Sequence, residues 1–268
     1  MADNGVWRTS LDTSRLGAAP WPVEVLAETG STNAVLADRA RAGGAEQVLV
    51  TEHQTAGRGR LDRTWDTPAR AALTFSVLLR PAVEPSRWPL LPLLVGSAVR
   101  TAVARLGVPA TVKWPNDVLI GELKVAGILV ERVDSPAGAA AVVGVGLNVS
   151  TTADELPVPT ATSLTLELAR DQGPGHEPDR TALLLDLLTT LERGYGDWVE
   201  KGDGFLRTAY VPHCSTLGRE VRVDLPGART LRGTARDLDG LGRLVVDTAD
   251  GSTSVDAGDV VHVRRDDQ

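Results

Sequence analysis

The segment QTAGRGRLDR, residues 54–63, combines cationic side chains with backbone freedom, and an anion-binding loop needs both. Gly57 and Gly59 permit backbone conformations and close approaches that larger residues forbid. Arg58 and Arg60 supply planar, permanently charged donors that suit phosphate oxygens. The glycines also predict a loop that becomes ordered over its ligand. A solvated hairpin with surface arginines would look the same, so this segment alone leaves both interpretations open.

The pentapeptide KWPND, residues 113–117, places two further polar side chains beside a proline. Pro115 limits the preceding strand and leaves Asn116 and Asp117 in a turn, where their side chains can face a pocket. The alternative is that both residues merely form an Asx-turn. The pentapeptide is therefore a candidate part of a polar site.

Three more candidate residues lie in apolar segments downstream. Lys124 and Gly127 occur in LKVAGILVE, and Asn148 follows the apolar run VVGVGL. Lys124 either contacts a ligand or snorkels from a strand edge. Gly127 either lets a ligand approach the backbone or marks a β-bulge. Asn148 is either a ligand contact or a polar residue that closes a strand, so local chemistry leaves each choice open.

Common catalytic signatures are absent from the sequence. It contains no G-x-x-x-x-G-K-[ST], no G-x-G-x-x-G that opens a helix, and no G-x-S-x-G. The four histidines are scattered, and none lies at a metal-ligand spacing from Cys214, the only cysteine. We therefore expect neither a P-loop enzyme nor a serine hydrolase, and no metal site built from protein ligands alone.

The composition indicates a soluble globular protein with a local basic site. The chain has 268 residues, 42% of them hydrophobic, and a net charge of −7. No apolar run approaches the roughly 20 residues of a membrane span, and the N-terminus does not resemble a signal peptide. A lone cysteine suits the cytosol. Acidic chains are poor nucleic-acid binders, so we expect a phosphate-sized ligand and no specific DNA partner. From the preceding features we also expect a cytoplasmic location and no membrane partner.

Hydrophobic periodicity predicts the elements that carry these motifs. Expected strands and strand segments are 23–28, 46–54, 72–79, 110–133 around a turn at Gly121-Glu122, and 139–149. Expected helices are 31–44 with Ser31 or Thr32 as its cap, one within 86–107 that begins near Pro92, and 179–200. The segment 151–163 is expected to be a loop. From Cys214 onward, short alternating strands and Asp-Gly turns predict a small β-barrel of about 50 residues, which leans on the larger domain.

Five segments, taken in order and with their approximate spacing, resemble the biotin–protein ligase family. They are STN at 31–33, QTAGRGR at 54–60, KWPNDVLI at 113–120, LKVAGILVE at 123–131 and GVGLN at 144–148. The resemblance covers about residues 20–210, and the tail matches the family's SH3-like C-terminal domain. It implies an α+β fold of the class II synthetase/biotin–lipoate ligase type, with a mixed β-sheet flanked by helices. The implied domains are 1–213 (catalytic) and 214–268 (SH3-like).

The resemblance also implies an activity and its partners. The family activates biotin with MgATP to biotinyl-5′-AMP, and then transfers the biotinyl group to one lysine of a carboxylase carrier domain. We accordingly expect a biotin–[acetyl-CoA-carboxylase] ligase that uses biotin, ATP and Mg²⁺, with the biotin carboxyl carrier domain as its partner. Some members carry an N-terminal DNA-binding domain. Only about 20 residues precede the first expected strand here, so we expect no repressor role.

Residue roles follow from the same resemblance. The expected biotin or adenylate contacts are Ser31, Thr32, Asn33, Gln54, Arg58, Gly59, Arg60, Lys124 and Gly127. The expected nucleotide contacts are Trp65, Asn116 and Asn148. The expected catalytic residues are Arg60, Lys124 and Asp117, with the possibility that Asp117 orients or deprotonates the acceptor amine.

Two alternatives to this activity remain at the level of sequence. A lipoate–protein ligase would share the fold, but its usual arginine–triple-glycine signature is absent. A non-enzymatic binding module would use the arginines to grip an acidic surface. The sequence also departs from the family pattern, because Leu61 and Asp62 precede Arg63 where a small or basic pair is usual. Asp62 would bring a negative charge close to phosphate.

Overall fold

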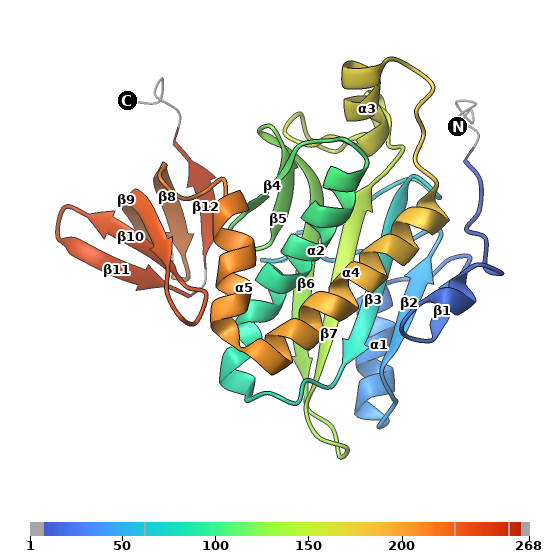
Figure 1. Ribbon diagram of the computed structural model, residues 1–268, viewed down its shortest axis with the longest axis horizontal. Helices are drawn as coiled ribbons and strands as arrows, with labels where there is room; N and C mark the ends of the chain where they lie inside the picture. The colour runs from blue at the N-terminus through green and yellow to red at the C-terminus, as the bar shows by residue number, and fades with distance from the viewer. Residues whose placement is uncertain (1–7, 62, 228, 257, 264–268) are drawn as a thin grey trace.

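Two β-sheets organise the chain in the computed structural model, which describes residues 8–61, 63–227, 229–256 and 258–263. The larger sheet has seven strands in the order β1-β2-β3-β7-β6-β5-β4 (Figure 1). Its strands are β1 (Val23–Leu26), β2 (Gln47–Thr51), β3 (Ala72–Leu79), β4 (Ala110–Lys113), β5 (Asp117–Ile120), β6 (Leu123–Val133) and β7 (Ala140–Asn148). β1 and β2 are parallel and the other neighbours are antiparallel, so the expected mixed sheet is confirmed.

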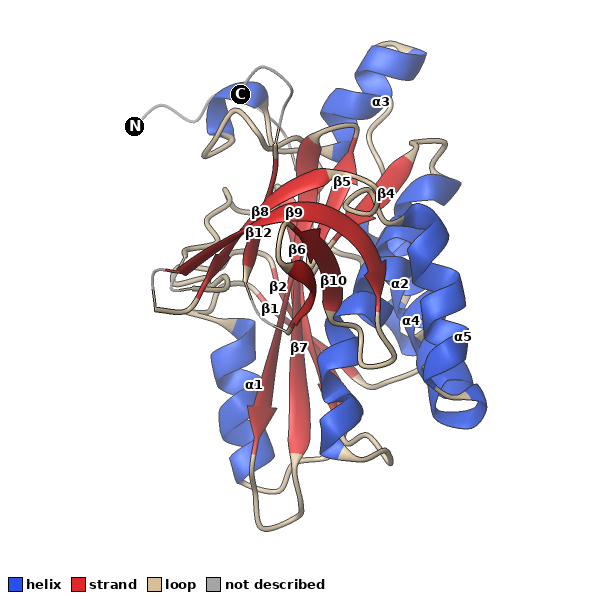
Figure 2. Cartoon of the chain, turned by 90° about the vertical axis from the view of Figure 1, so that its left-hand side faces the viewer, coloured by secondary structure: helices blue, strands red, loops and turns tan. Residues whose placement is uncertain are grey.

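Helices cover both faces of this sheet, which explains why its central strands are almost continuously apolar. Figure 2 shows α1 on one side and α2, α4 and α5 on the other. The α-helices are α1 (Thr32–Arg41), α2 (Leu91–Arg105), α3 (Leu164–Gln172), α4 (Arg180–Lys201) and α5 (Asp203–Tyr210). Short 3₁₀ helices span Leu16–Ala18, Pro85–Leu90, Ala153–Glu155 and Val211–His213. Among the described residues, no helix is long and apolar enough to cross a membrane.

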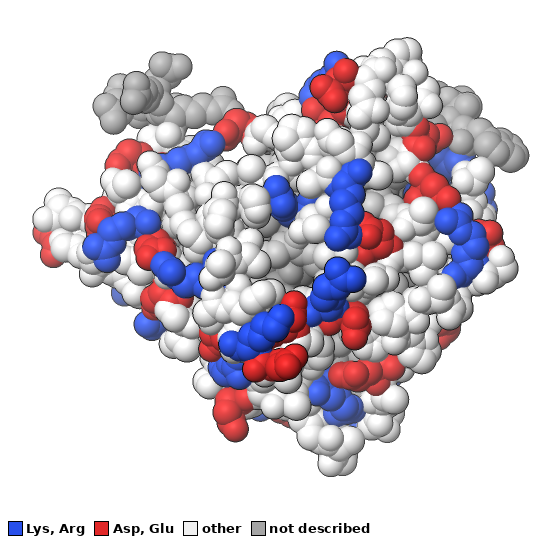
Figure 3. All heavy atoms as spheres, in the orientation of Figure 1, with Lys and Arg blue, Asp and Glu red and all other residues white. Residues whose placement is uncertain are grey.

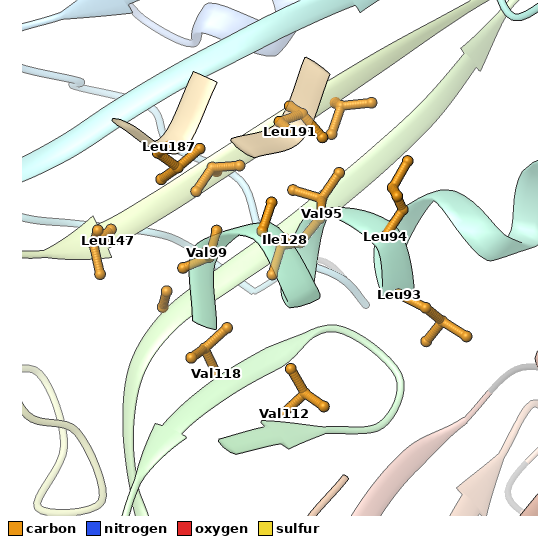
Figure 4. Packing of buried hydrophobic residues seen from close by; sticks show 14 of the residues in the cluster. Leu93, Leu94, Val95, Val99, Val112, Val118, Ile128, Leu147, Leu187 and Leu191 are labelled. Atoms are coloured by element: carbon orange, nitrogen blue, oxygen red, sulfur yellow. The ribbon is translucent and has the colours of Figure 1, made fainter. Parts of the chain in front are cut away.

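Side-chain alternation along β3 divides the core between the two faces. Phe75 and Val77 belong to the large cluster beneath α2 and α4, whereas Leu78 belongs to a smaller cluster beneath α1. Figure 4 shows part of the large cluster, in which Val95 and Val99 of α2 lie between the sheet and α4. The face beneath α1 is less completely filled by apolar side chains, because other strands contribute glycines there. That face holds the candidate site.

The expected helices at 31–44, near Pro92 and at 179–200 are confirmed as α1, α2 and α4, with ends shifted by a few residues. Ser31 caps α1, since its side chain accepts a hydrogen bond from the backbone N–H of Ala34 at 3.4 Å. α3 and α5 were not expected. They are short and each buries only two side chains, so their apolar period is too brief to recognise.

The C-terminal β-domain is present as a five-stranded antiparallel sheet in the order β11-β10-β9-β8-β12. Its strands are β8 (Glu220–Leu225), β9 (Arg229–Leu238), β10 (Leu244–Thr248), β11 (Gly251–Val255) and β12 (Asp259–His262). Figure 2 shows how strongly β8 and β9 curve. On the face of the molecule shown in Figure 3, basic and acidic side chains are interspersed.

Trp114 joins the two domains at the segment that carries KWPND. Only 2% of its surface is exposed. Its backbone N–H donates to the Thr216 hydroxyl at 3.1 Å, and its indole N–H donates to the Gly242 carbonyl at 2.9 Å. The Ser215 N–H donates to the Val112 carbonyl at 2.8 Å, which continues the junction. The C-terminal domain therefore fixes the backbone that presents Asn116.

His262 lies in the same junction and gives it a pH dependence. Its Nε2 lies 3.2 Å from the Thr216 hydroxyl, and its Nδ1 lies 3.4 Å from the Arg219 guanidinium. Burial, together with the nearby Lys113 and Arg219, lowers the pKa of His262 from 6.5 to about 4, although Glu122 opposes this shift. The folded protein therefore holds this imidazole neutral at pH values where the unfolded chain is protonated.

We expect stability to decline as the pH falls from 6.5 toward 4, because only the unfolded state takes up a proton at His262 in this window. His262→Gln should make the free energy of unfolding less dependent on pH between these limits. Urea titrations at a series of pH values measure this, with His176→Gln at an exposed position as the control. Parallel profiles for wild type and His262→Gln would contradict the assignment.

Candidate ligand-binding cleft

Two adjoining cavities meet beneath residues 54–65, which we call the arginine loop. The sheet pocket, with a volume of about 110 Å³, lies on the α1 side of the large sheet. The interdomain cleft, with a volume of about 690 Å³, lies between the arginine loop, the start of α2 and the C-terminal domain. Arg58, Gly59 and Arg60 border both cavities. The loop predicted to bind an anion is therefore the roof of a continuous concave region.

Three glycines form the floor of the sheet pocket. Gly127 on β6 is paired with Gly146 on β7, and Gly144 lies two residues earlier on β7. A Cβ atom at Gly146 would lie 2.3 Å from the ring of Trp65, and one at Gly144 would lie 2.3 Å from the Asn33 Oδ1. The sheet surface must therefore remain free of side chains here. The glycines are required by space and not by an unusual backbone conformation.

Lys124 enters the pocket from β6 and does not point into open solvent. Its ammonium lies 2.6 Å from the Asp117 carboxylate and 5.8 Å from the centroid of the Trp65 ring. The backbone of Lys124 forms two hydrogen bonds to the segment before α3. The Lys124 N–H donates to the Thr160 carbonyl, and the Lys124 carbonyl accepts from the Thr162 N–H, each at 2.8 Å. Lys124 is thus held in the pocket wall by protein groups, and its role as a ligand contact stays a prediction.

Asn116 and Arg60 bind one another at the border of the two cavities. The Arg60 guanidinium donates to the Asn116 Oδ1 at 3.0 Å and to the Gly258 carbonyl at 3.3 Å. The Asn116 amide donates in turn to the Ile128 carbonyl at 2.9 Å. Burial lowers the pKa of Arg60 from its ordinary value, although the charges of Asp117 and Asp259 oppose this effect. A half-buried cation is thus held at the cleft by neutral partners.

Arg58 and Arg63 hold the other parts of the arginine loop. Arg58 donates to the Glu131 carboxylate at 3.1 Å, and Arg63 forms an ion pair with Asp259 of the C-terminal domain. The loop therefore contacts β6 at one point and the C-terminal domain at another. The expectation about Asp62 lies outside the described residues.

Trp65, at the end of the loop, lies over the glycine floor. Its indole N–H is buried and has no hydrogen-bond partner among the described residues. A buried donor without an acceptor is destabilising, so this atom is available to a ligand oxygen. The predicted site residues that line the sheet pocket are Ser31, Thr32, Asn33, Gln54, Arg58, Gly59, Arg60, Trp65, Asn116, Asp117, Lys124 and Gly127.

Asn148 is the one predicted site residue that lines neither of these cavities among the described residues. Its side chain is buried and its amide donates to the Thr162 carbonyl at 3.0 Å. Since the Thr162 N–H bonds to the carbonyl of Lys124, Asn148 supports the backbone behind that lysine. Its role as a nucleotide contact stays a prediction.

Sequence reasoning missed several residues that shape the site. Ser76 and Glu131 contact the predicted residues directly, while Gly144 and Gly146 line the floor. Ser76 had a usable signal, because it is a hydroxyl within the apolar strand ALTFSVLL. Glu131 had only its charge at the end of an apolar run. Clusters of three or more His, Cys, Asp or Glu side chains able to hold a metal ion are absent from the described residues.

Comparison with known proteins agrees with this architecture. Residues 25–148 match the Biotin/lipoate A/B protein ligase family, and residues 216–263 match the Biotin protein ligase C terminal domain. The biotin–[acetyl-CoA-carboxylase] ligase of Mycobacterium tuberculosis is 43% identical over 249 residues, which cover 90% of this chain and 89% of that protein. The corresponding ligase of Paracoccus denitrificans is 30% identical over 88% of this chain and 98% of its own length.

Solved structures give the same result. The biotin protein ligase of Aquifex aeolicus, in complex with biotin and ATP, superimposes with a TM-score of 0.72 at 28% identity, over 91% of this chain and 99% of that one. The ligase of Leishmania major, in complex with biotinyl-5-AMP, gives a TM-score of 0.59 at 27% identity, over 89% and 100% of the two chains. The chain belongs to the biotin protein ligase family.

Proposed function

We propose that this chain is a biotin–[acetyl-CoA-carboxylase] ligase, which activates biotin with ATP to biotinyl-5′-AMP and transfers the biotinyl group to a carrier lysine. The observation that carries the proposal is the placement of Lys124, Arg58 and Arg60 around a glycine-floored pocket. The proposal is also supported by a relative, because a biotin–[acetyl-CoA-carboxylase] ligase is 43% identical to this chain over 90% of its residues.

The two cavities suit the two halves of the adenylate. In our proposal the sheet pocket receives biotin, because its walls offer neutral polar groups and Trp65 lies over its glycine floor. The contacts would come from Ser31, Thr32, Gln54 and Gly127. The unpartnered indole N–H of Trp65 would donate to a ligand oxygen. The nucleotide would extend past Asn116 toward the larger interdomain cleft.

Cations address the main electrostatic problem of the first step. The biotin carboxylate attacks the α-phosphorus of ATP and pyrophosphate leaves with the bonding electrons, so two anions must approach each other. Lys124 and Arg60 lie where they can offset this repulsion and stabilise charge on the phosphoryl oxygens. Arg58 would close the pocket behind the ligand. We propose Lys124 and Arg60 as the cations that assist adenylate formation, and Arg58 as the residue that closes the pocket.

Mg²⁺ fits this site as a companion of the nucleotide. Mg²⁺ is commonly held by one or two carboxylates together with substrate phosphates and water, so it does not need a cluster of protein ligands. The Asp117 carboxylate, which lies in the pocket wall, is the oxygen donor that would hold it during the first step. When bound, Mg²⁺ neutralises phosphate charge during the transfer.

The second step requires a neutral amine from the acceptor. The free lysine side chain has a pKa near 10.4 and is mostly protonated at neutral pH. We propose that Asp117 orients this amine and accepts its proton as the nitrogen attacks the acyl carbon and AMP leaves. The carboxylate lies in the pocket wall and is held by Lys124 at 2.6 Å.

The remaining proposals concern context. We propose the biotin carrier domain of an acyl-CoA carboxylase as the acceptor, and the cytoplasm as the location, because activation consumes ATP. We also propose a functional division into residues 1–213 and 214–268. The C-terminal domain contributes Gly258 and Asp259 to the anchoring of the arginine loop, so this division does not separate two independent sites.

Exchange of labelled pyrophosphate into ATP tests the activity against its alternatives. The purified protein should catalyse exchange that depends on biotin and that lipoate does not stimulate, because adenylate formation is reversible. Stimulation by lipoate in place of biotin would identify a lipoate ligase, and absence of exchange with either acid would favour a non-enzymatic binding module.

Lys124→Gln should lower the rate of adenylate formation by about 10²–10³-fold, the usual cost of removing one preorganised donor at a developing charge. Chemically prepared biotinyl-5′-AMP should restore much of the transfer to the acceptor, because the loss falls on the first step. Single-turnover assays of each step measure both effects.

Lys201→Gln is the matched control, because Lys201 forms an ion pair with Asp197 on the surface of α4. It should leave both steps unchanged. Near-normal ATP-dependent biotinylation by a folded Lys124→Gln protein would remove Lys124 from the mechanism.

A further inference from the structure

A line of buried polar side chains crosses the large sheet beside the sheet pocket. Ser76 lies on β3 with none of its surface exposed. Its hydroxyl lies 2.6 Å from the Asn33 Oδ1 and 2.7 Å from the Thr32 hydroxyl. The carbonyl oxygen of an amide only accepts, so Ser76 donates to Asn33. A buried polar group without a hydrogen-bond partner destabilises the fold. Side chains that are all partnered in such a core therefore indicate a network with a role.

Asn33 passes over β7 to reach β6. It does so at Gly144, where an added Cβ would lie 2.3 Å from its Oδ1. On the far side, its amide nitrogen donates to the Glu131 carboxylate at 2.7 Å. Both ends of the Asn33 side chain are thus occupied by protein groups, and only 4% of the residue is exposed. Asn33 therefore bridges Ser76 on β3 and Glu131 on β6, and little of its amide remains for a ligand.

Glu131 contacts Asn33 on one side and Arg58 of the arginine loop on the other. Its oxygens accept from the Asn33 amide at 2.7 Å and lie 3.1 Å from the Arg58 guanidinium. The Glu131 side chain is 29% exposed, so its charge is less screened than that of an open surface pair. The hydrogen bond from Asn33 thus helps to orient the Glu131 carboxylate toward Arg58.

Arg58 links the arginine loop to Glu131. Its flanking backbone is bonded within the loop itself, because the Gly59 N–H donates to the Arg63 carbonyl at 2.6 Å and the Trp65 N–H donates to the Gly57 carbonyl at 3.0 Å. The Arg58 side chain is half exposed, and Glu131 is the carboxylate that it contacts among the described residues. Arg60 and Arg63 are instead attached to Asn116 and to Asp259. Backbone hydrogen bonds from Thr55 and Ala56 to the segment before α1 hold the start of the loop, and Glu131 holds it at Arg58.

We propose that Glu131 is a positioning residue that keeps the arginine loop closed over the sheet pocket, and that Asn33, which accepts a hydrogen bond from Ser76, holds Glu131 in place. It contacts Arg58 and not the reacting atoms. The inference rests on the proposed function in one respect, which is that the molecule retained under the closed loop is biotinyl-5′-AMP. Its effect belongs to retention of this intermediate, and not to the chemistry at phosphorus.

The primary variant is Glu131→Gln, which preserves the shape of the side chain and removes its charge. We expect it to release preformed biotinyl-5′-AMP about tenfold faster than wild type, the scale of one lost charge-assisted hydrogen bond. Asp134→Asn is the matched control, since Asp134 forms an exposed ion pair with Arg132 just beyond the same strand. Release from Asp134→Asn and the melting temperature of both variants should match wild type.

A double-mutant cycle of Glu131→Gln and Arg58→Ala tests whether Glu131 acts through Arg58 or has a general structural role. In an Arg58→Ala background, Glu131→Gln should add little to the release rate, because the residue through which it acts is already missing. Two effects that multiply, or a release rate for Glu131→Gln equal to wild type, would overturn the proposal. Ser76→Ala should accelerate release in the same direction by a smaller factor, and it serves as the second variant if Glu131→Gln does not fold.

Trypsin cleavage of the ligand-free protein tests the anchor without any catalytic readout. Cleavage between Arg58 and Arg63 should be faster in Glu131→Gln than in wild type and Asp134→Asn. If wild type fails to form an adenylate but this difference is present, the proposed function is wrong and the anchor stands. If wild type forms the adenylate and cleavage is equal in all three proteins, the anchor is wrong.

Discussion

The face of the large sheet beneath α1 must stay free of side chains where β6 and β7 meet, and the rest of the site depends on this constraint. Gly127, Gly144 and Gly146 supply the bare surface. Trp65 and Asn33 then occupy positions that a single methyl group would block. The opposite face of the same strands packs against α2 and α4, so a rigid core supports the open surface.

The C-terminal domain completes the site instead of lying beside it. Trp114 bonds to Thr216 and Gly242, which fixes the segment that carries Asn116. Arg60 reaches the carbonyl of Gly258, and Arg63 reaches Asp259. A small β-sheet of this size gains stability from such a junction. The arginine loop is thereby held between two domains, and Arg58 and Arg60 border both the sheet pocket and the interdomain cleft.

Much of the fold could be predicted, because strong periodicity survives in the sequence. The strand ALTFSVLL has the predicted bounds, and the helix capped by Ser31 and the helices that contain Pro92 and Leu187 are present. The arginine loop and KWPND were recognisable by unusual residue types. The link between Asn33 and Glu131 was not, because these residues lie 98 positions apart and meet only where α1 packs across β7 beside β6. Strand register, which is set by tertiary packing, decides such contacts.

Biotin binding to Gly146→Ala, measured by titration calorimetry, tests the central claim that the bare floor creates the site. The added methyl group would displace Trp65 from the floor. The account predicts an affinity at least about tenfold weaker, the scale of an overpacking cost above roughly 1 kcal/mol, with the fold intact. Gly196→Ala, at an exposed position of α4 with open space around it, should bind biotin like wild type. An unchanged affinity in Gly146→Ala would contradict the account.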